Sequence, residues 1–334
     1  MRQILFLFSA IGLFFSPSFA QKKLIKIEGA TQGSSYHISY YDDQDRDLEE
    51  GVNQILRDFD KSVSTYDPNS IISRVNRAEK NVVVDKYFKD CFLKAMEVSK
   101  NTDGAFDATV GPLVNAWGFG PGKKLKMNQR IIDSLLKFVG YNLVELKGDS
   151  VIKKDPRVYL DFNAFAPGYS VDVVSKFLES KGITSYIVEI GGEVFARNKK
   201  DDGDYWKVGI EKPIDNPGSS NPLKAIAKLE NKSIATSGNY RKFYLEDGKR
   251  YSHHIDPKTG YPTKNNLLSV SVLANDCVSA DAYATGILVM GMEKALIFLN
   301  NHPEFEVYLI YSDDKGNYKV YESRGLKKYI SDAK

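Results

Sequence analysis

The chain has 334 residues, of which 46 are Lys or Arg and 43 are Asp or Glu, so its formal net charge at pH 7 is only +3. This balance argues against a general nucleic-acid binder, which usually shows a marked excess of basic residues. The length is sufficient for one large domain or two small ones. Only two cysteines occur, Cys91 and Cys277, and we expect two free, mostly buried thiols because a chain of this size needs no disulfide to hold its core.

The first 20 residues have the pattern of a secretory signal peptide. Arg2 gives a short positive region, Ile4 to Phe15 is an apolar run too short to span a bilayer comfortably, and Ser18 and Ala20 provide the small residues of a cleavage site. No cysteine follows the run, which argues against a bacterial lipid anchor. We therefore expect residues 1–20 to be removed. The mature chain, residues 21–334, would be a soluble exported domain without a transmembrane segment, periplasmic if the source is a Gram-negative bacterium.

Helices and a hairpin are predicted in the first half of the chain. Residues 23–41 alternate in polarity around Gly33, as in a β-hairpin. Apolar residues at helical spacing predict three helices, at residues 46–64, about 86–101 and about 128–138. A turn is expected at Ser64 to Ser70, where Pro68 and Asn69 supply the turn chemistry.

The second half mixes strands and helices. Val158 to Asp161 is predicted to be a short strand and Tyr169 to Ser180 a helix that Gly182 closes. Further strands are predicted at 185–192, 206–213, 226–230 and 267–274, around a hairpin signal at Asp247-Gly248, and in a final hairpin over 306–323. The elements follow no regular βαβ rhythm, which indicates an α+β fold: a single mixed domain with an antiparallel or mixed sheet and packed helices.

The segment Ser279 to Gly291 carries the most informative pair of side chains. Asp281 and Thr285 lie four residues apart at the start of an apolar, helix-periodic run, and residues at this spacing share one face of a helix. A carboxylate and a hydroxyl one turn apart offer two hard oxygen ligands for Mg²⁺. Taken alone, an Asp near a helix start is more often a cap.

Several other segments have both a structural and a functional interpretation. Gly191-Gly192-Glu193 could be a tight turn or a close approach of backbone to a ligand. The GFGPGKK segment at 118–124 lacks the spacing of a phosphate-binding loop and is better interpreted as a surface turn. His253 and His254 are adjacent; on a strand their side chains would point to opposite faces, so we expect at most one of them to face a site.

Six segments, in this order, resemble the motifs of the ApbE family of flavin transferases. They are GAFDATVGPLVNAWGFG (104–120), LDFNAFAPGYSVD (160–172), EIGGEVF (189–195), ATSGNYR (235–241), SHHIDPKTGYP (252–262) and SADAYAT (279–285). Each motif is weak by itself, but together they span nearly the whole mature chain. The resemblance implies an enzyme that takes FAD, attaches FMN through its phosphate to a Thr or Ser hydroxyl of a target protein, and releases AMP.

The same resemblance implies a metal site and a flavin cleft. The Mg²⁺ ligands would be the side chains of Asp281 and Thr285 and the main-chain carbonyl of Ala164. His253 would lie near the phosphates and either assist deprotonation of the acceptor hydroxyl or position it, with Asp281 as an alternative base. The residues matched to the family's FAD cleft are Gln32, Tyr66, Ala105, Phe106, Asp107, Asp161, Pro167, Ser237, Gly238 and His253.

The chain departs from the family pattern at several positions. Ala108 replaces a Pro, Phe162-Asn163 replaces Leu-Gly, and two further changes concern residues matched to the cleft. Pro167 stands where a Lys is common, and Gln32 stands where the family has Met. Pro brings neither a charge nor an N–H group, so a phosphate contact made by that Lys is lost here. The acceptor implied by the family is an exported or membrane-embedded electron-transfer subunit with a D-x-x-[ST]-G-A-[ST]-like motif. Two alternatives use the same cleft: hydrolysis of FAD to FMN and AMP, and a flavin carrier without catalysis.

Overall fold

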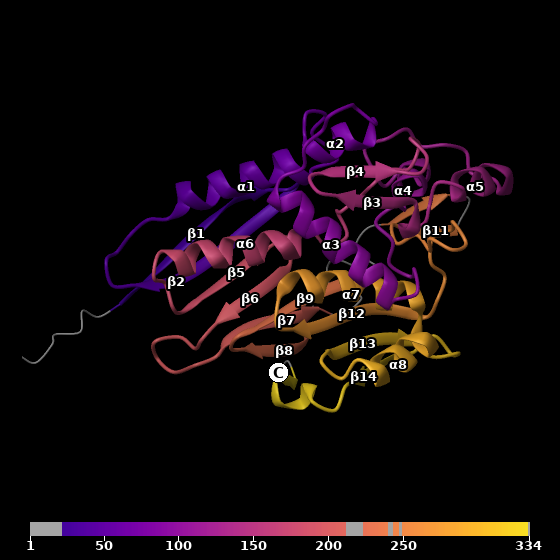
Figure 1. Ribbon diagram of the computed structural model, residues 1–334. Helices are drawn as coiled ribbons and strands as arrows, with labels where there is room; N and C mark the ends of the chain where they lie inside the picture. The colour runs from indigo at the N-terminus through magenta and orange to yellow at the C-terminus, as the bar shows by residue number, and fades with distance from the viewer. Residues whose placement is uncertain (1–21, 212–222, 240–242, 247–248, 333–334) are drawn as a thin grey trace, which may run out of the picture.

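The structure, a computed structural model, describes residues 22–211, 223–239, 243–246 and 249–332 (Figure 1). The predicted leader, residues 1–20, and the Asp247-Gly248 hairpin signal lie outside these described residues. In the described part of the chain, no helix is long and apolar enough to cross a membrane.

An eight-stranded sheet forms the centre of the molecule, and every neighbouring pair in it is antiparallel. Its order is β1-β2-β5-β6-β9-β12-β13-β14. The strands are β1 (Lys23–Thr31), β2 (Ser34–Asp42), β5 (Tyr186–Ile190), β6 (Glu193–Arg197), β9 (Lys232–Gly238), β12 (Leu267–Ala274), β13 (Glu306–Ser312) and β14 (Tyr318–Glu322). Together with the helices below, this sheet confirms the predicted α+β class.

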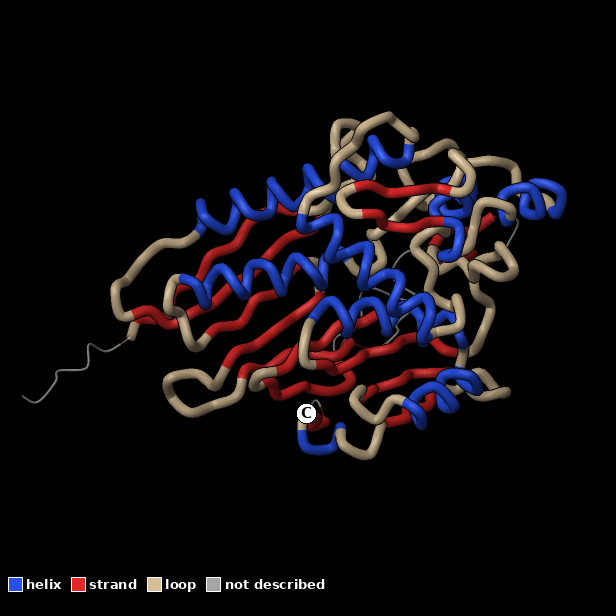
Figure 2. Tube along the Cα trace, in the orientation of Figure 1, coloured by secondary structure: helices blue, strands red, loops and turns tan. Residues whose placement is uncertain are grey.

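Helices cover one face of this sheet, as Figures 1 and 2 show. They are α1 (Glu49–Val63), α3 (Lys86–Asn101), α6 (Ala166–Ser180) and α7 (Cys277–Met290), with the shorter α2 (Ile71–Asn76) and α8 (Met292–Asn301) beside them. Helix α6 packs on β5 and β6, helix α7 packs on β9 and β12, and the two helices pack against each other. The two helices that carry most of the predicted metal and phosphate residues are therefore held side by side on one sheet.

A second, three-stranded sheet covers the opposite face. Its strands are β15 (Ile330–Asp332), β8 (Leu223–Leu229) and β7 (Trp206–Glu211), in that order. Successive side chains of β6 point to opposite faces of the central sheet. Phe195 packs in the core cluster that includes α6, whereas Val194 and Ala196 pack in the cluster that includes the second sheet. Every residue of β6 except its last is buried.

Smaller elements close the end of the molecule near the site. They are the hairpin β10 (Phe243–Glu246) and β11 (Lys249–Ser252), the hairpin β3 (Val144–Lys147) and β4 (Ser150–Lys153), the helices α4 (Gly111–Trp117) and α5 (Gln129–Leu136), and the short turns η1 (Tyr141–Leu143) and η2 (Leu326–Lys328). Leu113, Trp117, Ile132 and Ile255 form a local apolar cluster there.

Most of the predicted elements are confirmed. The helix over 86–101 and the strand over 267–274 have the predicted bounds, and Gly182 ends α6 with a φ of +80°. Both cysteines are free and buried, as expected.

The predicted strand over Val158 to Asp161 is wrong. Only an isolated parallel bridge between Val110 and Tyr159 forms there. The main chain of Leu160 is bonded instead by the side chain of Asn76, whose Oδ1 accepts from the Leu160 N–H (2.7 Å) and whose Nδ2 donates to the Leu160 carbonyl (2.8 Å). A side chain thus takes the place that a neighbouring strand would occupy.

Candidate functional site

The start of helix α7 is fixed by two carboxylates. The Asp276 side chain caps the helix by accepting from the Ser279 N–H (2.9 Å). Asp172, from α6, accepts from the N–H groups of Cys277 (2.8 Å) and Val278 (2.9 Å). Burial raises the pKa of Asp172 to about 7, while these two N–H bonds oppose the rise. The capping roles belong to these residues, so the Asp281 side chain is available for another task.

Asp281 lies where α6 and α7 approach most closely. Its Oδ2 accepts a hydrogen bond from the N–H of Gly168 (3.0 Å), in the first turn of α6. A Cβ atom at position 168 would lie 2.6 Å from the Cys277 carbonyl oxygen and 2.7 Å from the Asp281 Cβ. The close contact between the helices therefore requires glycine here. The backbone conformation does not, since it is an ordinary helical one that any residue can adopt.

The three oxygen groups of the predicted metal site come from two segments, helix α7 and the loop before α6. The Thr285 hydroxyl lies one turn after Asp281 and donates to the Ala164 carbonyl oxygen (3.3 Å), in the loop before α6. The same hydroxyl lies 3.0 Å from Ser237 Oγ, near the end of β9. Asp281, Thr285 and Ala164 thus line one region, and their role as ligands of one metal ion stays a prediction.

The chemistry of this group of oxygens fits Mg²⁺. A carboxylate, a hydroxyl and a main-chain carbonyl are hard donors, and Mg²⁺ commonly takes one or two protein carboxylates and completes its shell with water or phosphate. No cluster of three or more His, Cys, Asp or Glu side chains suited to a metal occurs among the described residues. The candidate set relies instead on one carboxylate with two neutral oxygens.

These oxygens open onto a cleft with a cavity of about 320 Å³. Most residues predicted for the flavin and metal sites line it, namely Tyr66, Ala105, Phe106, Asp107, Asp161, Ala164, Pro167, Ser237, Gly238, His253, Asp281 and Thr285. They come from segments spread over more than two hundred positions of the sequence, and the fold brings them to one place.

Gln32 is not among the residues that line this cavity. It occupies the turn between β1 and β2 with a φ of +52°, and neither polar atom of its carboxamide has a hydrogen-bond partner within the described residues. The neighbouring Ser35 carbonyl accepts from the N–H of Gly191 (3.0 Å), a lining residue. Gln32 therefore belongs to the hairpin that borders the cleft, and its predicted flavin contact stays a prediction.

Asp107 and Asp161, two of the three aspartates that line the cleft, differ in how many hydrogen bonds their carboxylates already accept. Asp107 accepts from the Thr109 N–H (2.8 Å) and hydroxyl (2.6 Å) and from the Tyr141 N–H (2.7 Å). Asp161 accepts from the Asn163 N–H (2.8 Å). Burial raises the pKa of both carboxyls. Asp107 consequently acts mainly to hold its own loop, and Asp161 has more capacity left for a ligand.

Tyr66 stands at the mouth of the cleft with 62% of its surface exposed. It follows α1 in the predicted Ser64 to Ser70 turn, which is confirmed. Phe106 forms part of the floor and packs edge-on against Phe165, with ring centroids 5.6 Å apart. A lining that contains one exposed and one buried aromatic ring suits the binding of a flat ring system.

The expectation that at most one of His253 and His254 faces a site is wrong. Strand β11 ends at Ser252, so the two residues do not alternate as on a strand. Their ring centroids lie 3.8 Å apart, and both residues line the cleft. Burial and then the neighbouring His253 lower the pKa of His254 well below its usual value, and its buried Nδ1 has no hydrogen-bond partner in the described part of the chain.

Glu193, at the start of β6, is a lining residue whose carboxylate was assigned no role from the sequence, although the Gly191-Gly192-Glu193 segment was noted. It is nearly buried, and its Oε2 would lie 3.2 Å from a Cβ atom at Gly191. Burial and then the Glu193 carboxylate raise the pKa of Asp281 well above its usual value. The available signal in the sequence was the Gly191-Gly192-Glu193 run. If the glycine turn borders a ligand, the side chain that follows the turn can face that ligand as well.

The cleft is strongly acidic. Asp107, Asp161, Glu193 and Asp281 line it, and no Lys or Arg occurs among its described lining residues. Like charges in a partly desolvated space repel one another unless a cation or protons balance them. The arrangement therefore favours a bound cation between the carboxylates and any anionic ligand.

Comparison with known proteins gives one consistent result. Residues 32–309 match the model of the ApbE family. The chain is 36% identical over 324 residues to a Haemophilus influenzae protein named FAD:protein FMN transferase, with 92% of each chain covered. It is 33% identical over 315 residues to the Escherichia coli K12 protein of the same name, covering 91% of this chain and 88% of that protein.

Solved structures show the same similarity. The structure of the flavin transferase ApbE from Vibrio cholerae superposes with a TM-score of 0.83 at 34% identity, covering 92% of this chain and 99% of that one. The apo form of the Pseudomonas stutzeri flavinyl transferase ApbE gives a TM-score of 0.82 at 30% identity, with 93% and 98% covered.

Proposed function

The chain belongs to the ApbE family and is an enzyme of its transferase class, and we propose that it moves FMN from FAD to a Thr or Ser hydroxyl of a target flavoprotein in an Mg²⁺-dependent reaction that releases AMP. The relatives' shared name supports the flavin transfer. The metal, the acceptor hydroxyl and the AMP product rest on the site described above and on the family resemblance.

The acidity of the cleft is the observation that carries the metal dependence. A diphosphate brings further negative charge to a cavity that already contains four carboxylates and, among its described lining residues, no Lys or Arg. Mg²⁺ held by Asp281, Thr285 and the Ala164 carbonyl would neutralise the diphosphate oxygens as the P–O bond breaks. Such a cation also explains how the buried Asp281 and Glu193 carboxylates can both be ionised beside the substrate.

The proposed transfer forms one bond and breaks one bond. The acceptor hydroxyl oxygen attacks the phosphorus of the FMN half, and the bond from that phosphorus to the bridging oxygen breaks, so that AMP leaves with the bridging oxygen. The hydroxyl proton passes to a base, for which His253 is our first candidate and Asp281 the alternative. Ser237 and Thr285 orient the oxygen groups around the reacting phosphate, because their hydroxyls lie 3.0 Å apart.

We also propose that residues 21–334 form the transferase domain and that residues 1–20 direct its export to the periplasm. The predicted signal peptide supports this location. The acceptor would then be an exported or membrane-bound electron-transfer subunit.

The test is an incubation of residues 21–334 with FAD, Mg²⁺ and a flavin-free acceptor domain that carries a D-x-x-[ST]-G-A-[ST] motif. We expect AMP release together with flavin fluorescence on the denatured acceptor, and loss of both when EDTA replaces Mg²⁺. AMP without a fluorescent acceptor would indicate the hydrolase, and bound FAD without AMP would indicate a carrier.

A variant pair tests the metal assignment. Asp281→Ala should lower turnover by about a hundredfold or more, because it removes the charged ligand of the proposed site, and should weaken Mg²⁺-dependent FAD binding. Asp133→Ala, at an exposed aspartate of α5 that does not line this cleft, is the matched control. Full turnover in Asp281→Ala would remove the metal assignment.

A further inference from the structure

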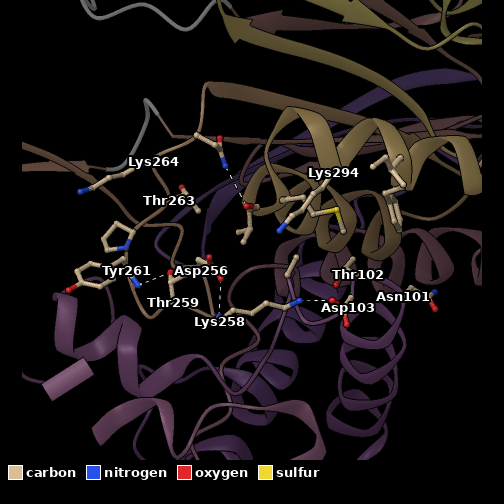
Figure 3. Close-up of a pocket in the computed structure, with 17 residues that line it drawn as sticks. Asn101, Thr102, Asp103, Asp256, Lys258, Thr259, Tyr261, Thr263, Lys264 and Lys294 are labelled. Atoms are coloured by element: carbon tan, nitrogen blue, oxygen red, sulfur yellow. Dashed lines mark hydrogen bonds and ion pairs between the residues drawn. The ribbon is translucent and has the colours of Figure 1, made fainter. Parts of the chain in front are cut away.

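A second cavity, of about 700 Å³, adjoins the acidic cleft (Figure 3). It lies between the end of α3, the loop at residues 256–265 and the region where α7 passes into α8. Ala105 and Val289 line both spaces. The loop borders both as well, since Pro257 faces the cleft whereas Asp256 and Lys258 face the second cavity.

One face of α7 leads from the proposed metal site into this cavity. Asp281, Thr285 and Val289 succeed one another at intervals of four residues, so they lie along the same side of the helix. The eight-residue separation corresponds to about 12 Å along the helix axis. An extended polypeptide covers this length with about four residues.

The charge of the second cavity is the opposite of that in the cleft. Lys258, Lys264 and Lys294 line it, against Asp103 and Asp256. Lys258 pairs with Asp103 (2.5 Å), as Figure 3 shows. Lys264 and Lys294 are exposed, and neither forms an ion pair with any residue in the described ranges. Their charge is therefore available to an acidic partner.

Exposed apolar surface accompanies these lysines. Ile297, on α8, lines the second cavity with 62% of its surface exposed, and the partly buried Met290 also lines it. A space that combines apolar surface with free cationic groups suits a polypeptide segment with both apolar and acidic side chains.

We propose that the second cavity binds the segment of the acceptor protein that carries the reactive hydroxyl, in an extended conformation and with an acidic side chain within a few residues of that hydroxyl. This inference rests on the proposed transferase function. In an in-line displacement, the attacking and leaving oxygens lie on opposite sides of the phosphorus. A space that adjoins the cleft and shares Ala105 and Val289 with it gives the acceptor an approach apart from the space proposed for FAD.

The test compares the double variant Lys264→Glu and Lys294→Glu with the unaltered enzyme. The probe is the flavin-free acceptor domain with the D-x-x-[ST]-G-A-[ST] motif, and AMP release and acceptor fluorescence are measured against both acceptor and FAD concentration. We expect the KM for the acceptor to rise about tenfold, because two attractive charges become repulsive. The KM for FAD should change less than about twofold.

Two controls separate docking from a general charge effect. Lys26→Glu with Lys80→Glu makes the same change of charge at exposed lysines outside both cavities and should leave both KM values unaltered. An acceptor whose motif Asp is changed to Lys should be poor for the unaltered enzyme and improved for the double variant.

The outcomes are distinct. An acceptor KM that is the same in the double variant and the parent would overturn the inference, and so would an equal rise in the KM for FAD, which would assign the cavity to the substrate FAD. Failure of the unaltered enzyme to label any acceptor while it still releases AMP would instead refute the transferase function, and this inference would fall with it.

Discussion

Replacing Gly168 by Ala tests the geometry that positions Asp281. The added Cβ would meet the Cys277 carbonyl oxygen at 2.6 Å and the Asp281 Cβ at 2.7 Å, about 0.7 Å short of ordinary contact in each case. Neither atom can turn away, because one is main chain and the other is fixed by its helix. Gly168 has helical backbone angles, so in the absence of this contact Ala should stabilise α6 by about 1 kcal/mol.

The expected net effect is a loss of stability. Overpacking of this kind costs roughly 1–3 kcal/mol, and the fixed neighbours place Gly168→Ala near the upper end. After the gain in helix propensity, we expect the free energy of unfolding to fall by about 2 kcal/mol. Separation of α6 from α7 also lengthens the hydrogen bond from the Gly168 N–H to Asp281, so kcat for flavin transfer should fall about tenfold or more.

Urea unfolding monitored by circular dichroism, together with the transfer assay, measures both effects. Gly182→Ala is the matched control at the other end of α6, since a Cβ there has no neighbour within 4 Å but the φ is +80°. It should lose about 1 kcal/mol of stability and keep the parental kcat. A urea midpoint for Gly168→Ala at or above that of the parent would refute the packing argument, because the gain in helix propensity would then outweigh any cost of overpacking.

Two further predictions concern titratable groups. His253→Ala should lower kcat for transfer more than it weakens FAD binding, whereas His37→Ala, at an exposed strand position, should do neither; a defect in FAD affinity alone would remove the proposed role in proton transfer. Asp172 has a pKa raised from 3.8 to about 7, chiefly by burial, so the folded state retains a proton that the unfolded chain releases. Its contribution to stability is therefore present below about pH 4 and lost as the pH rises through about 7, by on the order of 4 kcal/mol in total. Between pH 4 and 8, the free energy of unfolding should decline less steeply with pH for Asp172→Asn than for the parent. Equal slopes against pH would contradict the raised pKa of Asp172.

Local sequence patterns predicted the elements whose determinants are local. The helix over residues 86–101 was predicted with its observed bounds because its cap and its apolar spacing lie within one segment, where Asp85 accepts from the Phe88 N–H. The strand predicted around Leu160 failed because the deciding contact is the side chain of Asn76, 84 positions away. Strand β6 was missed because Gly191 and Gly192 indicate a turn without indicating that another strand begins directly after it.

The same distinction holds within the site. Asp281 and Thr285 could be paired from sequence because a helix fixes their spacing. Glu193 begins strand β6 whereas Asp281 lies on helix α7, so the electrostatic interaction between them depends on how the strand and the helix pack. The contact between the rings of His253 and His254 arises because strand β11 ends at Ser252. Neither arrangement can be inferred from residue spacing, so both required the tertiary structure.

Pro167 bears on how this chain binds a diphosphate. It occupies the first turn of α6, lines the cleft, and replaces the Lys expected from the family pattern. A first-turn Pro is compatible with the helix, but it leaves the described cleft lining with four carboxylates and no Lys or Arg. In the proposed function, Mg²⁺ balances the charge of the diphosphate, and we therefore expect FAD binding to depend on Mg²⁺ to an unusual degree.

Pro167→Lys should therefore tighten FAD binding in EDTA by about tenfold, the effect of one added ion pair in a partly buried site, while binding in Mg²⁺ changes less. Pro167→Ala is the control, because it removes the ring and restores an N–H group without adding charge. Fluorescence titration of FAD with and without Mg²⁺ measures the four dissociation constants of the two variants. Equal dissociation constants for FAD in EDTA from Pro167→Lys and Pro167→Ala would contradict this explanation. The dependence of FAD binding on Mg²⁺ would then have to come from desolvation of the buried carboxylates and not from the absence of a cationic side chain.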